Sequence, residues 1–484
     1  MKYRHSLLFV LLMTVLPAGV FAQDLESGYF LGGNPYAFRL NPAFQSERTV
    51  LSIALAGTGS TVWSNLGAST LLYPDENGKL YSCLNDRVST SKFLDKISRN
   101  NVIGMDARVN LLTLGFWADR RYYTLDFNVR SLNSVSIPRD VFRFLKDDTS
   151  GTFDFSGLGF RANEFVEAAF GWSKNYDNVF NVGFRVKALV GVAEAEMAMK
   201  KMQLSMNGSK WEIQAEGYLH ASSPSLYAST HENGDLDFES IRFRDGTYGP
   251  AGYGGAVDLG ASWNVLPNLT LSASVLDLGA IFWNREINGI SPETAYTWEP
   301  SQEESQGAGD WEDEIETAAE DLANVIHVKS GPKGGALGMM PLQVLVGAEY
   351  RMPFYERLTV GALYMGRYGE SMSRQSGRVS LNWNPLNWMS MSTGATLNRL
   401  GESFSFAFNL HPAGINLLFG CDYVPIHTIG YMVDADDLGD LFPGKDRVKV
   451  SVPRDQMKLN FYLGLNLAFG QRRLDHSKRF RHDR

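Results

Sequence analysis

The side chains with the clearest chemical character are charged residues at every second position of predicted strands. In residues 104–118, for example, Asp106 and Arg108 alternate with apolar side chains. Successive side chains of a strand point to opposite faces, so these charges share one face and apolar residues share the other. The charges assigned to the polar, inward face in this way are Asp106, Arg108, Asp126, Arg130, Arg185, Lys187, Glu212, Asp258, Glu349, Arg351, Arg367, Arg378, Asp422 and Lys458.

Both signs of charge occur on this polar face, which leaves two interpretations open. The charges could pair with one another and so fill and stiffen the interior of the sheet structure. Alternatively, they could line a path for polar solutes or hold another segment of the chain in place. The net charge of −8 argues against nucleic acid as a partner.

The spacing of histidines, cysteines and carboxylates indicates no catalytic or metal site. Hydrolases with a serine or aspartate nucleophile usually need a nearby histidine, but the histidines fall in predicted loops, strand ends, turns or the tail. No CxxC or HExxH spacing occurs, so we expect no metal, no cofactor and no enzyme. The acidic run 311–321 could bind Ca²⁺, but without EF-hand spacing a solvated helix face is favoured. Cys83 and Cys421 give no disulfide framework, although one bridge between them is possible.

The elements that must position the charges are clearest in residues 341–423. There, Phe404, Phe406 and Phe408 share one face of a run whose intervening residues are small. The same rule places Cys421 and Tyr423 on the apolar face of the next run. Repeated period-two alternation across short breaks predicts consecutive strands in an antiparallel up-and-down meander.

This repeat predicts an all-β fold, a transmembrane up-and-down antiparallel β-barrel over residues 49–470. Strands of about ten residues with one apolar face and one face rich in Gly, Ser and Asn are typical of lipid outside and a wet lumen inside. A closed barrel also removes the sheet edges that lipid does not tolerate. The rival interpretation, a secreted soluble propeller or sandwich, is disfavoured because no blade-length repeat is present.

Direct counting gives sixteen strands, joined by alternating short and long connections. Outer-membrane barrels have short periplasmic turns and longer outside loops, so both chain ends are expected in the periplasm. The long loops contain predicted helices at 91–98, 139–145 and 311–325. Their apolar residues could frame a pocket or pack the helices onto the barrel rim; those of the first two helices are Phe93, Leu94, Ile97, Val141, Phe142 and Leu145.

The two ends of the chain have compositions of their own. Residues 1–22 combine a basic start, an apolar run at 7–16 that is too short to span a membrane, and a small-residue cleavage site at Ala22. This pattern predicts a secretory signal peptide. Residues 23–48 are either a turn-rich leader or a plug in the barrel mouth. Residues 471–484 form a basic periplasmic tail, expected to be solvated.

Asn41, Pro42 and Ala43 lie just ahead of the first predicted strand. They resemble the Asn-Pro-Ala box in the plug of FadL-type hydrophobic-compound transporters, and the box of related Bacteroidota-type outer-membrane barrels, which include accessory proteins of the type IX secretion system. Residues 275–279 (Val-Leu-Asp-Leu-Gly), followed by Trp283, resemble a motif of an uncharacterised branch of those barrels. The resemblance implies about fourteen strands, an N-terminal plug and passive uptake of a hydrophobic small molecule.

We therefore expect an outer-membrane barrel of about 14 to 16 strands, whose partners are membrane lipid and a hydrophobic small molecule. The alternative is a non-transporting scaffold or secretion-system accessory protein that docks protein partners through its loops. A general porin is a weaker third hypothesis, because the Asn-Pro-Ala box and the long leader argue against an open pore.

Overall fold

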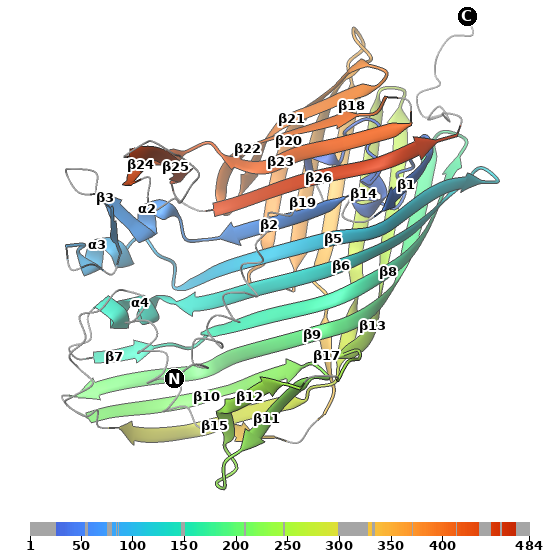
Figure 1. The fold of residues 1–484 in the computed structure, drawn as a ribbon. Coiled ribbons are helices and arrows are strands. Elements are labelled where there is room, and N and C mark those ends of the chain that lie inside the picture. Colours follow the sequence, from blue (N-terminus) through green and yellow to red (C-terminus); the bar gives the residue numbers. More distant parts are fainter. Residues whose placement is uncertain are drawn as a thin grey trace, which may run out of the picture.

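The wall of the molecule is a closed antiparallel β-barrel, shown by the computed structural model in Figure 1. The structure describes residues 26–53, 57–74, 80–83, 85, 87–146, 151–207, 210–244, 247–298, 328–331, 334–369, 371–412, 414–434, 447–454 and 457–470. The expected signal peptide (1–22), acidic helix (311–325) and basic tail (471–484) lie outside these residues.

Fourteen strands form the wall, and each pairs with the next along the chain. Counting β1 with β2, and β17 with β18, as one strand each, they are β1 (Thr49–Ile53) and β2 (Thr58–Ser64), β5 (Asn100–Ala118), β6 (Arg121–Pro138), β8 (Gly159–Tyr176), β9 (Phe180–Asn207), β13 (Gly252–Leu266), β14 (Leu269–Trp283), β17 (Ala336–Met339) and β18 (Leu342–Arg351), β19 (Leu358–Tyr368), β20 (Arg374–Leu386), β21 (Met389–Asn398), β22 (Gly401–Leu410), β23 (Ile415–Pro425) and β26 (Met457–Phe469). The barrel closes where β26 pairs with β1 and β2, for example Thr49 with Phe469. The predicted all-β barrel is confirmed.

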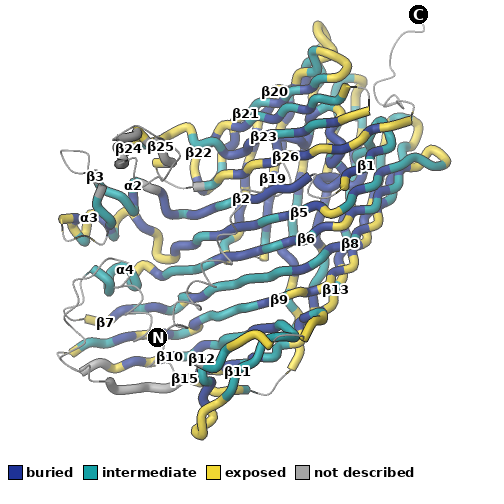
Figure 2. The backbone as a smooth tube through the Cα atoms, in the orientation of Figure 1, coloured by how far each residue is buried: buried dark blue, intermediate teal, exposed yellow. Residues whose placement is uncertain are grey.

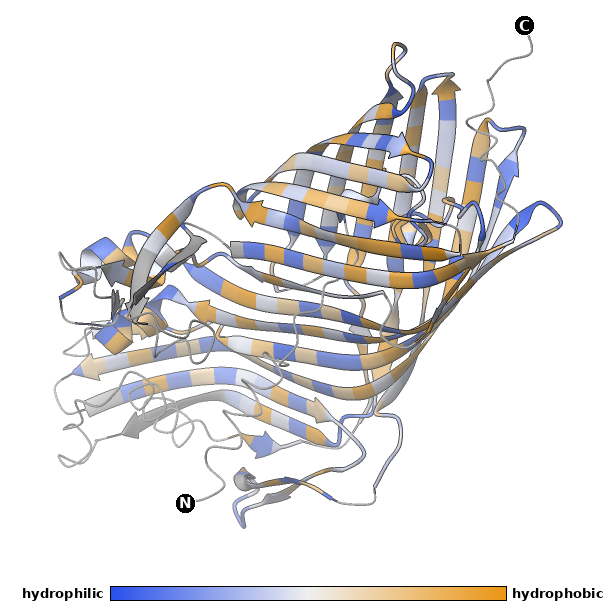
Figure 3. Ribbon diagram, turned by 45° about the horizontal axis from the view of Figure 1, so that its top comes forward, coloured by the Kyte–Doolittle hydropathy of each residue, from blue (hydrophilic) through white to orange (hydrophobic). Residues whose placement is uncertain are grey.

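Period-two alternation along each strand sets the two surfaces of the wall. In β26, Leu459, Phe461 and Leu463 expose 42–55% of their surface on the outside, while the intervening Asn460 and Tyr462 expose 2% inside. Figure 3 shows apolar and polar residues alternating along the wall strands, and Figure 2 shows how burial alternates with them. A closed wall with an apolar outer surface satisfies its backbone groups internally, as a membrane-spanning barrel must.

Direct counting overestimates the number of wall strands because β9 is unusually long, at 28 residues. Its first part, Phe180 to Gly191, pairs with β13 in the wall. Its second part, Glu194 to Asn207, continues past the wall and pairs with β10 (Lys210–Ser222), which pairs in turn with β15 (Ile287–Trp298). These extra strands form a sheet extension beyond the barrel, so two of the sixteen expected wall strands belong outside it.

The connections divide the barrel into two rims. At the turn rim, the connections are short, and Asp119, Arg120, Asp177 and Asn178 take positive φ of 46–61°, which suits tight hairpins. At the loop rim, most connections are long and hold α2 (Ala68–Leu71), β3 (Leu72–Pro74), β4 (Leu80–Ser82), α3 (Thr90–Leu94), α4 (Arg139–Lys146), β7 (Gly151–Asp154), β11 (Leu226–Thr230), β12 (Leu236–Phe243), β16 (Lys329–Ser330), β24 (Thr428–Asp434) and β25 (Arg447–Pro453). No helix in the described part of the chain is both long and apolar enough to cross a membrane.

The loop helices pack tightly against their surroundings. Phe93 of α3 has no exposed surface and packs with Ile97 and Cys83, and Phe142 of α4 lies against the same cluster. On the other side of α4, Val141 packs against the cluster of β7, β9 and β10. In the described residues, these apolar side chains therefore hold the helices onto the loop rim, which favours the second of the two interpretations of their sequence.

Candidate functional site

Residues 26–48 lie inside the barrel, where Figure 1 shows them in dark blue, and we call them the N-terminal segment. Two short 3-10 turns, η1 (Glu26–Gly28) and η2 (Ala37–Arg39), shape it. Tyr29, Phe38 and Asn41 expose no more than 3% of their surface. The segment is therefore packed against the inner wall along its length.

Asparagine side chains fold this segment locally. Asn34 accepts a hydrogen bond from the Tyr36 amide at 3.0 Å and donates to the Gly28 carbonyl at 2.8 Å. Asn41 accepts from the Ala43 amide at 3.0 Å. In both places the side chain bonds a backbone amide two residues on, across a proline, which is the turn that asparagine favours.

The Asn-Pro-Ala box docks on β9, β13 and β14. The Asn41 amide group donates to the backbone carbonyls of Ala261 and Ala273, each at 3.2 Å. A Cβ atom added to Gly183 would overlap the Pro42 carbonyl group. The box therefore reaches the backbone of the wall because the wall has a glycine there.

A network of buried charges fills the lumen beside this box. Its members are joined by ion pairs and come from the N-terminal segment and from five wall strands. Four are basic and four are acidic: Arg39, Arg130, Arg185, Lys187, Asp126, Glu167, Asp258 and Asp277. We call this set the charge network. Its balance of signs matches the ion-pair interpretation of the inward charges.

Arg39 joins the N-terminal segment to the charge network. Its Nε and Nη2 donate to the two carboxylate oxygens of Asp126 at 3.0 and 2.8 Å, and Nη2 also donates to Thr113 at 3.0 Å. Arg185 donates to Asp126 and to Asp258, both at 3.0 Å. The Arg39 and Asp126 side chains have no exposed surface. Paired, hydrogen-bonded burial of this kind makes each charge dependent on its partner.

The other half of the charge network centres on Arg130. Its guanidinium donates to both carboxylate oxygens of Asp277 at 2.9 and 3.0 Å, and to Glu167 at 2.9 Å. Lys187 lies 2.7 Å from Asp258 and also contacts Asp277. This half ties β6, β8, β9, β13 and β14 together across the lumen.

The Val-Leu-Asp-Leu-Gly stretch of residues 275–279 contributes Asp277 to the charge network. Strict alternation from Val275 would place Asp277 on the lipid face. The residue instead takes a φ of 59° at a register shift between β13 and β14, and its amide donates to Asp258 at 2.8 Å. A β-bulge of this kind re-aims one side chain, and here it turns a carboxylate into the lumen, where it is 5% exposed.

A second, smaller ion cluster lies nearer the loop rim. Arg374 donates to Asp106 at 2.6 Å, and Arg367 lies 3.3 Å from the same carboxylate. The Arg374 guanidinium also lies 4.3 Å from the Trp63 ring centroid. Asp106 therefore holds two arginines of neighbouring strands, β19 and β20, on the inner wall.

The start of the N-terminal segment is held at a third place, which we call the latch. The backbone amides of Glu26 and Ser27 donate to the Asp422 carboxylate at 2.7 and 3.1 Å, and Arg378 donates to it at 2.9 Å. The Glu26 carboxylate accepts a hydrogen bond from the Tyr423 hydroxyl and lies 3.4 Å from the Lys458 ammonium. The latch consists of Glu26, Arg378, Asp422, Tyr423 and Lys458.

Tyr423 corrects a prediction, because alternation in β23 assigns it to the lipid face. It is 1% exposed, with a φ of 62°, beside a register shift between β22 and β23. The irregular backbone turns its ring inward, where the Lys458 ammonium lies 3.5 Å from the ring centroid. Cys421, assigned to the same outer face, is also buried, and no disulfide joins it to Cys83.

Apolar side chains of the N-terminal segment pack against apolar side chains of the wall strands β14, β18 and β19. We call this contiguous cluster the apolar seam. It consists of Tyr29, Phe30, Leu40, Phe44, Leu276, Leu345, Leu363 and Met365. The seam runs from Met365, in the loop-rim half of β19, to Phe44, just after the contact of Pro42 with Gly183 at the turn-rim end of β9.

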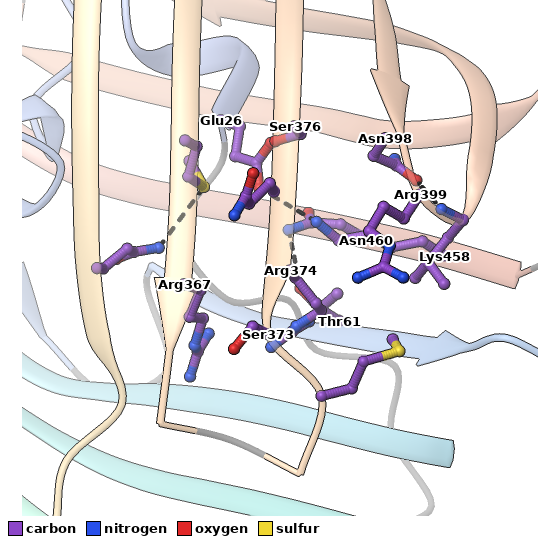
Figure 4. Close-up of a pocket in the computed structure, with 15 residues that line it drawn as sticks. Glu26, Thr61, Arg367, Ser373, Arg374, Ser376, Asn398, Arg399, Lys458 and Asn460 are labelled. Carbon is purple, nitrogen blue, oxygen red and sulfur yellow. Dashed lines mark hydrogen bonds and ion pairs between the residues drawn. The ribbon is translucent and has the colours of Figure 1, made fainter. Parts of the chain in front are cut away.

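A cavity lies at the loop-rim end of the apolar seam. Its volume is about 30 Å³, the space that one water molecule occupies in the liquid. Figure 4 shows side chains from the N-terminal segment and from several wall strands around it. The residues that line it include Glu26, Met365, Arg367, Arg374, Arg399 and Lys458. The cavity thus adjoins the latch and the seam at once.

The sequence over residues 42–422 matches the model of a family of unknown function, DUF5723. This chain belongs to that family. A comparison with curated proteins gives no match for it.

Several solved structures resemble this DUF5723 chain at low identity. The toluene transporter TbuX of Ralstonia pickettii is 9% identical, with a TM-score of 0.42, over 90% of this chain and 94% of that one. A FadL homologue of Pseudomonas aeruginosa is 10% identical, with a TM-score of 0.43, over 93% and 100%. The toluene transporter TodX of Pseudomonas putida is 8% identical, with a TM-score of 0.38, over 94% and 97%.

The structure of this DUF5723 chain places most of the inward-assigned charges in the lumen wall. Buried ones are Asp106, Arg108, Asp126, Arg130, Arg185, Lys187, Asp258, Arg367, Arg378 and Asp422. Lys458, Glu349 and Arg351 are half-buried, and Glu349 accepts a hydrogen bond from Thr359 at 2.7 Å. Glu212 differs, because it is exposed on β10 in the sheet extension. A bulge near Gly217 shifts the alternation of that strand.

Four members of the charge network and of the smaller ion cluster are missing from the charges that simple alternation assigned to the inner face. Glu167 follows the period of β8 and is detectable from sequence. Asp277 depends on a bulge. Arg374 falls in a predicted break between strands, and Arg39 precedes every predicted strand. Of the four, only Glu167 carries a signal that period-two spacing finds.

Proposed function

We propose that this chain is an outer-membrane barrel in which the N-terminal segment acts as a plug, and that it transports a small hydrophobic molecule passively. The exposed apolar belt and the short turns at one rim support an outer-membrane position with that rim in the periplasm. The hydrogen bonds of Asn41 and Arg39 to the wall support the role of a plug.

The apolar seam is the observation that carries the transport proposal. It connects the cavity at the loop rim with Phe44 near the turn rim, between the N-terminal segment and the wall. Apolar contacts have no directional bonds to break, so side chains there separate at lower cost than the ion pairs elsewhere in the lumen. A small displacement of the segment along the seam would open an apolar route beside it.

A bulky residue in the seam tests the proposal. Leu363 is 4% exposed in the seam, whereas its neighbour Ala362 is exposed on the outer face. We expect Leu363→Trp to add about 1.4 kcal/mol or more to the barrier and to slow uptake about tenfold. The matched control Ala362→Trp extends into lipid and should leave uptake unchanged. Uptake is measured in cells with a hydrophobic dye that fluoresces in lipid and that an intact outer membrane excludes.

The folded state is checked for both variants by the altered gel migration of unheated barrels, because overpacking costs about 1–3 kcal/mol. Equal uptake by Leu363→Trp and wild type would remove the seam as a route. If cells with the wild-type protein take up the dye no faster than cells without the protein, the transport proposal is refuted.

The charge network favours a second candidate function, that of a non-transporting scaffold. Four paired bases and four paired acids hold five strands and the N-terminal segment together, which suits a rigid barrel that presents its loops to protein partners. Absence of dye uptake, together with a stable protein complex in gentle detergent extracts, would support the scaffold over the transporter.

A further inference from the structure

The sheet extension carries a pocket of its own, outside the barrel. Its lining comes from three neighbouring strands, β9, β10 and β15, which Figure 1 shows continuing past the wall. The pocket has a volume of about 420 Å³, within the range of about 300–1,000 Å³ for pockets that hold small ligands. None of the described residues that line it belongs to the charge network, the latch or the apolar seam. A function of this pocket is therefore separable from transport through the barrel.

Two irregularities of strand pairing hollow the extension at Gly217. Between β9 and β10 the register shifts beside Gly217, and Lys200 is the extra residue on β9. Between β10 and β15 the register shifts again, from Gly217 to Ala215. A β-bulge bends its strand and re-aims side chains, and the glycine between these two bulges has no side chain to fill the space. The pocket is thus built by the backbone of paired strands rather than by a loop.

An aromatic platform forms part of the lining. The rings of Tyr218 and His220 stack with their centroids 4.5 Å apart and an angle of 20° between their planes. The Tyr218 hydroxyl donates to Glu196 at 3.1 Å, which orients the ring. Burial, together with the nearby Arg285, lowers the pKa of His220 to about 4, so its imidazole is neutral near neutral pH. Two stacked, uncharged and only half-buried rings thus offer a flat face to a ligand.

The rest of the lining is mixed in polarity and balanced in charge. Lys200 is exposed, with its ammonium 5.9 Å from the Tyr218 ring centroid, and Glu216 supplies a half-buried carboxylate. Ile290 adds an apolar side chain that is 43% exposed. One cation beside one carboxylate favours neither an anion nor a cation, but the pair can donate to and accept from hydroxyl groups. The lining therefore suits an uncharged ligand with C–H groups on its face and hydroxyl groups at its edge.

We propose that this pocket binds a neutral saccharide, with one face of a pyranose ring against Tyr218 and its hydroxyl groups bonded to Glu216 and Lys200. A sugar ring combines an apolar face of C–H groups with an edge of hydroxyl groups, so it matches the platform and the two charged side chains at once. The extension lies beyond the wall on the loop-rim side, which the proposed orientation places outside the cell. The saccharide there is either a free sugar or part of a longer chain.

Saturation-transfer NMR tests the pocket on the full-length protein in an amine-oxide detergent, which has no sugar head group. The probes are the methyl glycosides of glucose, galactose, mannose, N-acetylglucosamine and rhamnose. With at least one of them, we expect transfer to be several-fold stronger at the ring protons of one face than at the others, as stacking requires. An oligosaccharide of that sugar should bind more tightly than the single ring if the natural ligand is a chain, and equally if it is a free sugar. Absence of transfer to every probe, or equal transfer to cyclohexanol, overturns the proposal.

Variants of the platform separate binding from folding. Tyr218→Ala should weaken saccharide binding about tenfold, whereas Tyr218→Phe, which keeps the ring and loses the bond to Glu196, should retain it. Tyr248→Ala, at a tyrosine that is 92% exposed outside the pocket, is the matched control. Glu216→Gln should weaken binding several-fold, and Glu212→Gln, at an exposed carboxylate of the same strand, should not.

Loss of binding in Tyr218→Phe as well as in Tyr218→Ala would mean that the hydrogen bond to Glu196 shapes the extension, and the platform would not be the binding face. Dye uptake should be equal in wild type and Tyr218→Ala, because the pocket shares no residue with the apolar seam. Failure of the saccharide proposal and failure of the transport proposal are thus measured independently.

Discussion

The N-terminal segment is held at two ion-pair sites that differ in burial. At Arg39, the guanidinium and the Asp126 carboxylate have no exposed surface, and Thr113 satisfies a further donor. At the latch, Glu26 and Lys458 are each about one-tenth exposed, their separation is 3.4 Å, and a cavity adjoins them. The Arg39 site is thus enclosed, while the Glu26 site borders a small cavity.

This difference predicts which end of the segment moves. Removing one partner of a buried, hydrogen-bonded pair leaves an uncompensated charge and costs about 3–5 kcal/mol. A pair that reaches water loses less when one partner is removed, because water or another ion can replace that partner; Glu26 and Lys458 have such access in part, since each side chain is about one-tenth exposed. The Arg39 end should therefore stay docked under conditions in which the Glu26 end exchanges.

The largest effect is expected from Arg39→Met. The variant leaves the Asp126 carboxylate with one guanidinium partner fewer, and we expect docking of the segment to weaken by about 3–5 kcal/mol. Conductance across planar bilayers should rise from near zero to steady open channels, and a protease should cut the segment. The control is Arg48→Met, a half-buried arginine later in the same segment. A closed, protease-resistant Arg39→Met barrel would show that the charge network does not hold the segment.

The wall was largely predictable from sequence, for a physical reason. Between lipid and a polar lumen, every second residue must be apolar, so strands such as β18, β19 and β26 reveal both their extent and their faces. The extent of β9 was not predictable in this way. Its residues 194–207 continue the alternation beyond the wall, and neither alternation nor length marks where a strand leaves the barrel.

The site was less predictable than the wall. Parity places Asp126 and Arg185 together on the inner face, but it fails at Asp277 and Tyr423, whose positive φ values turn them inward. Such bulges depend on the pairing of two distant strands, which period-two spacing in one strand does not report. Arg39 joins the charge network only through the path of a segment without regular strands. The Asn-Pro-Ala box marked that segment, but not its charged partner.

An intermediate effect is expected from Gly183→Ala, which tests the enclosed end without touching a charge. The added methyl group would overlap the Pro42 carbonyl, and we expect overpacking to cost about 2–3 kcal/mol. Amides of residues 41–44 should then exchange faster with deuterium. The control Gly377→Ala adds a methyl group with no atom within 4 Å. If both variants exchange at the wild-type rate, the close fit at Gly183 contributes nothing to docking.

The smallest effect is expected at the latch, from Tyr423→Phe. The variant removes the hydroxyl that donates to Glu26, at a cost of about 1 kcal/mol, because the Glu26 carboxylate keeps Lys458 nearby. Exchange of the Ser27 amide, which donates to Asp422, should speed up roughly fivefold. Exchange at Asn41 should stay unchanged, because the Arg39 end remains docked. Tyr350→Phe, on the outer face, is the control. Equal acceleration at Ser27 and Asn41 would mean that the segment leaves the wall as one unit, and that its two ends do not differ in the way their burial implies.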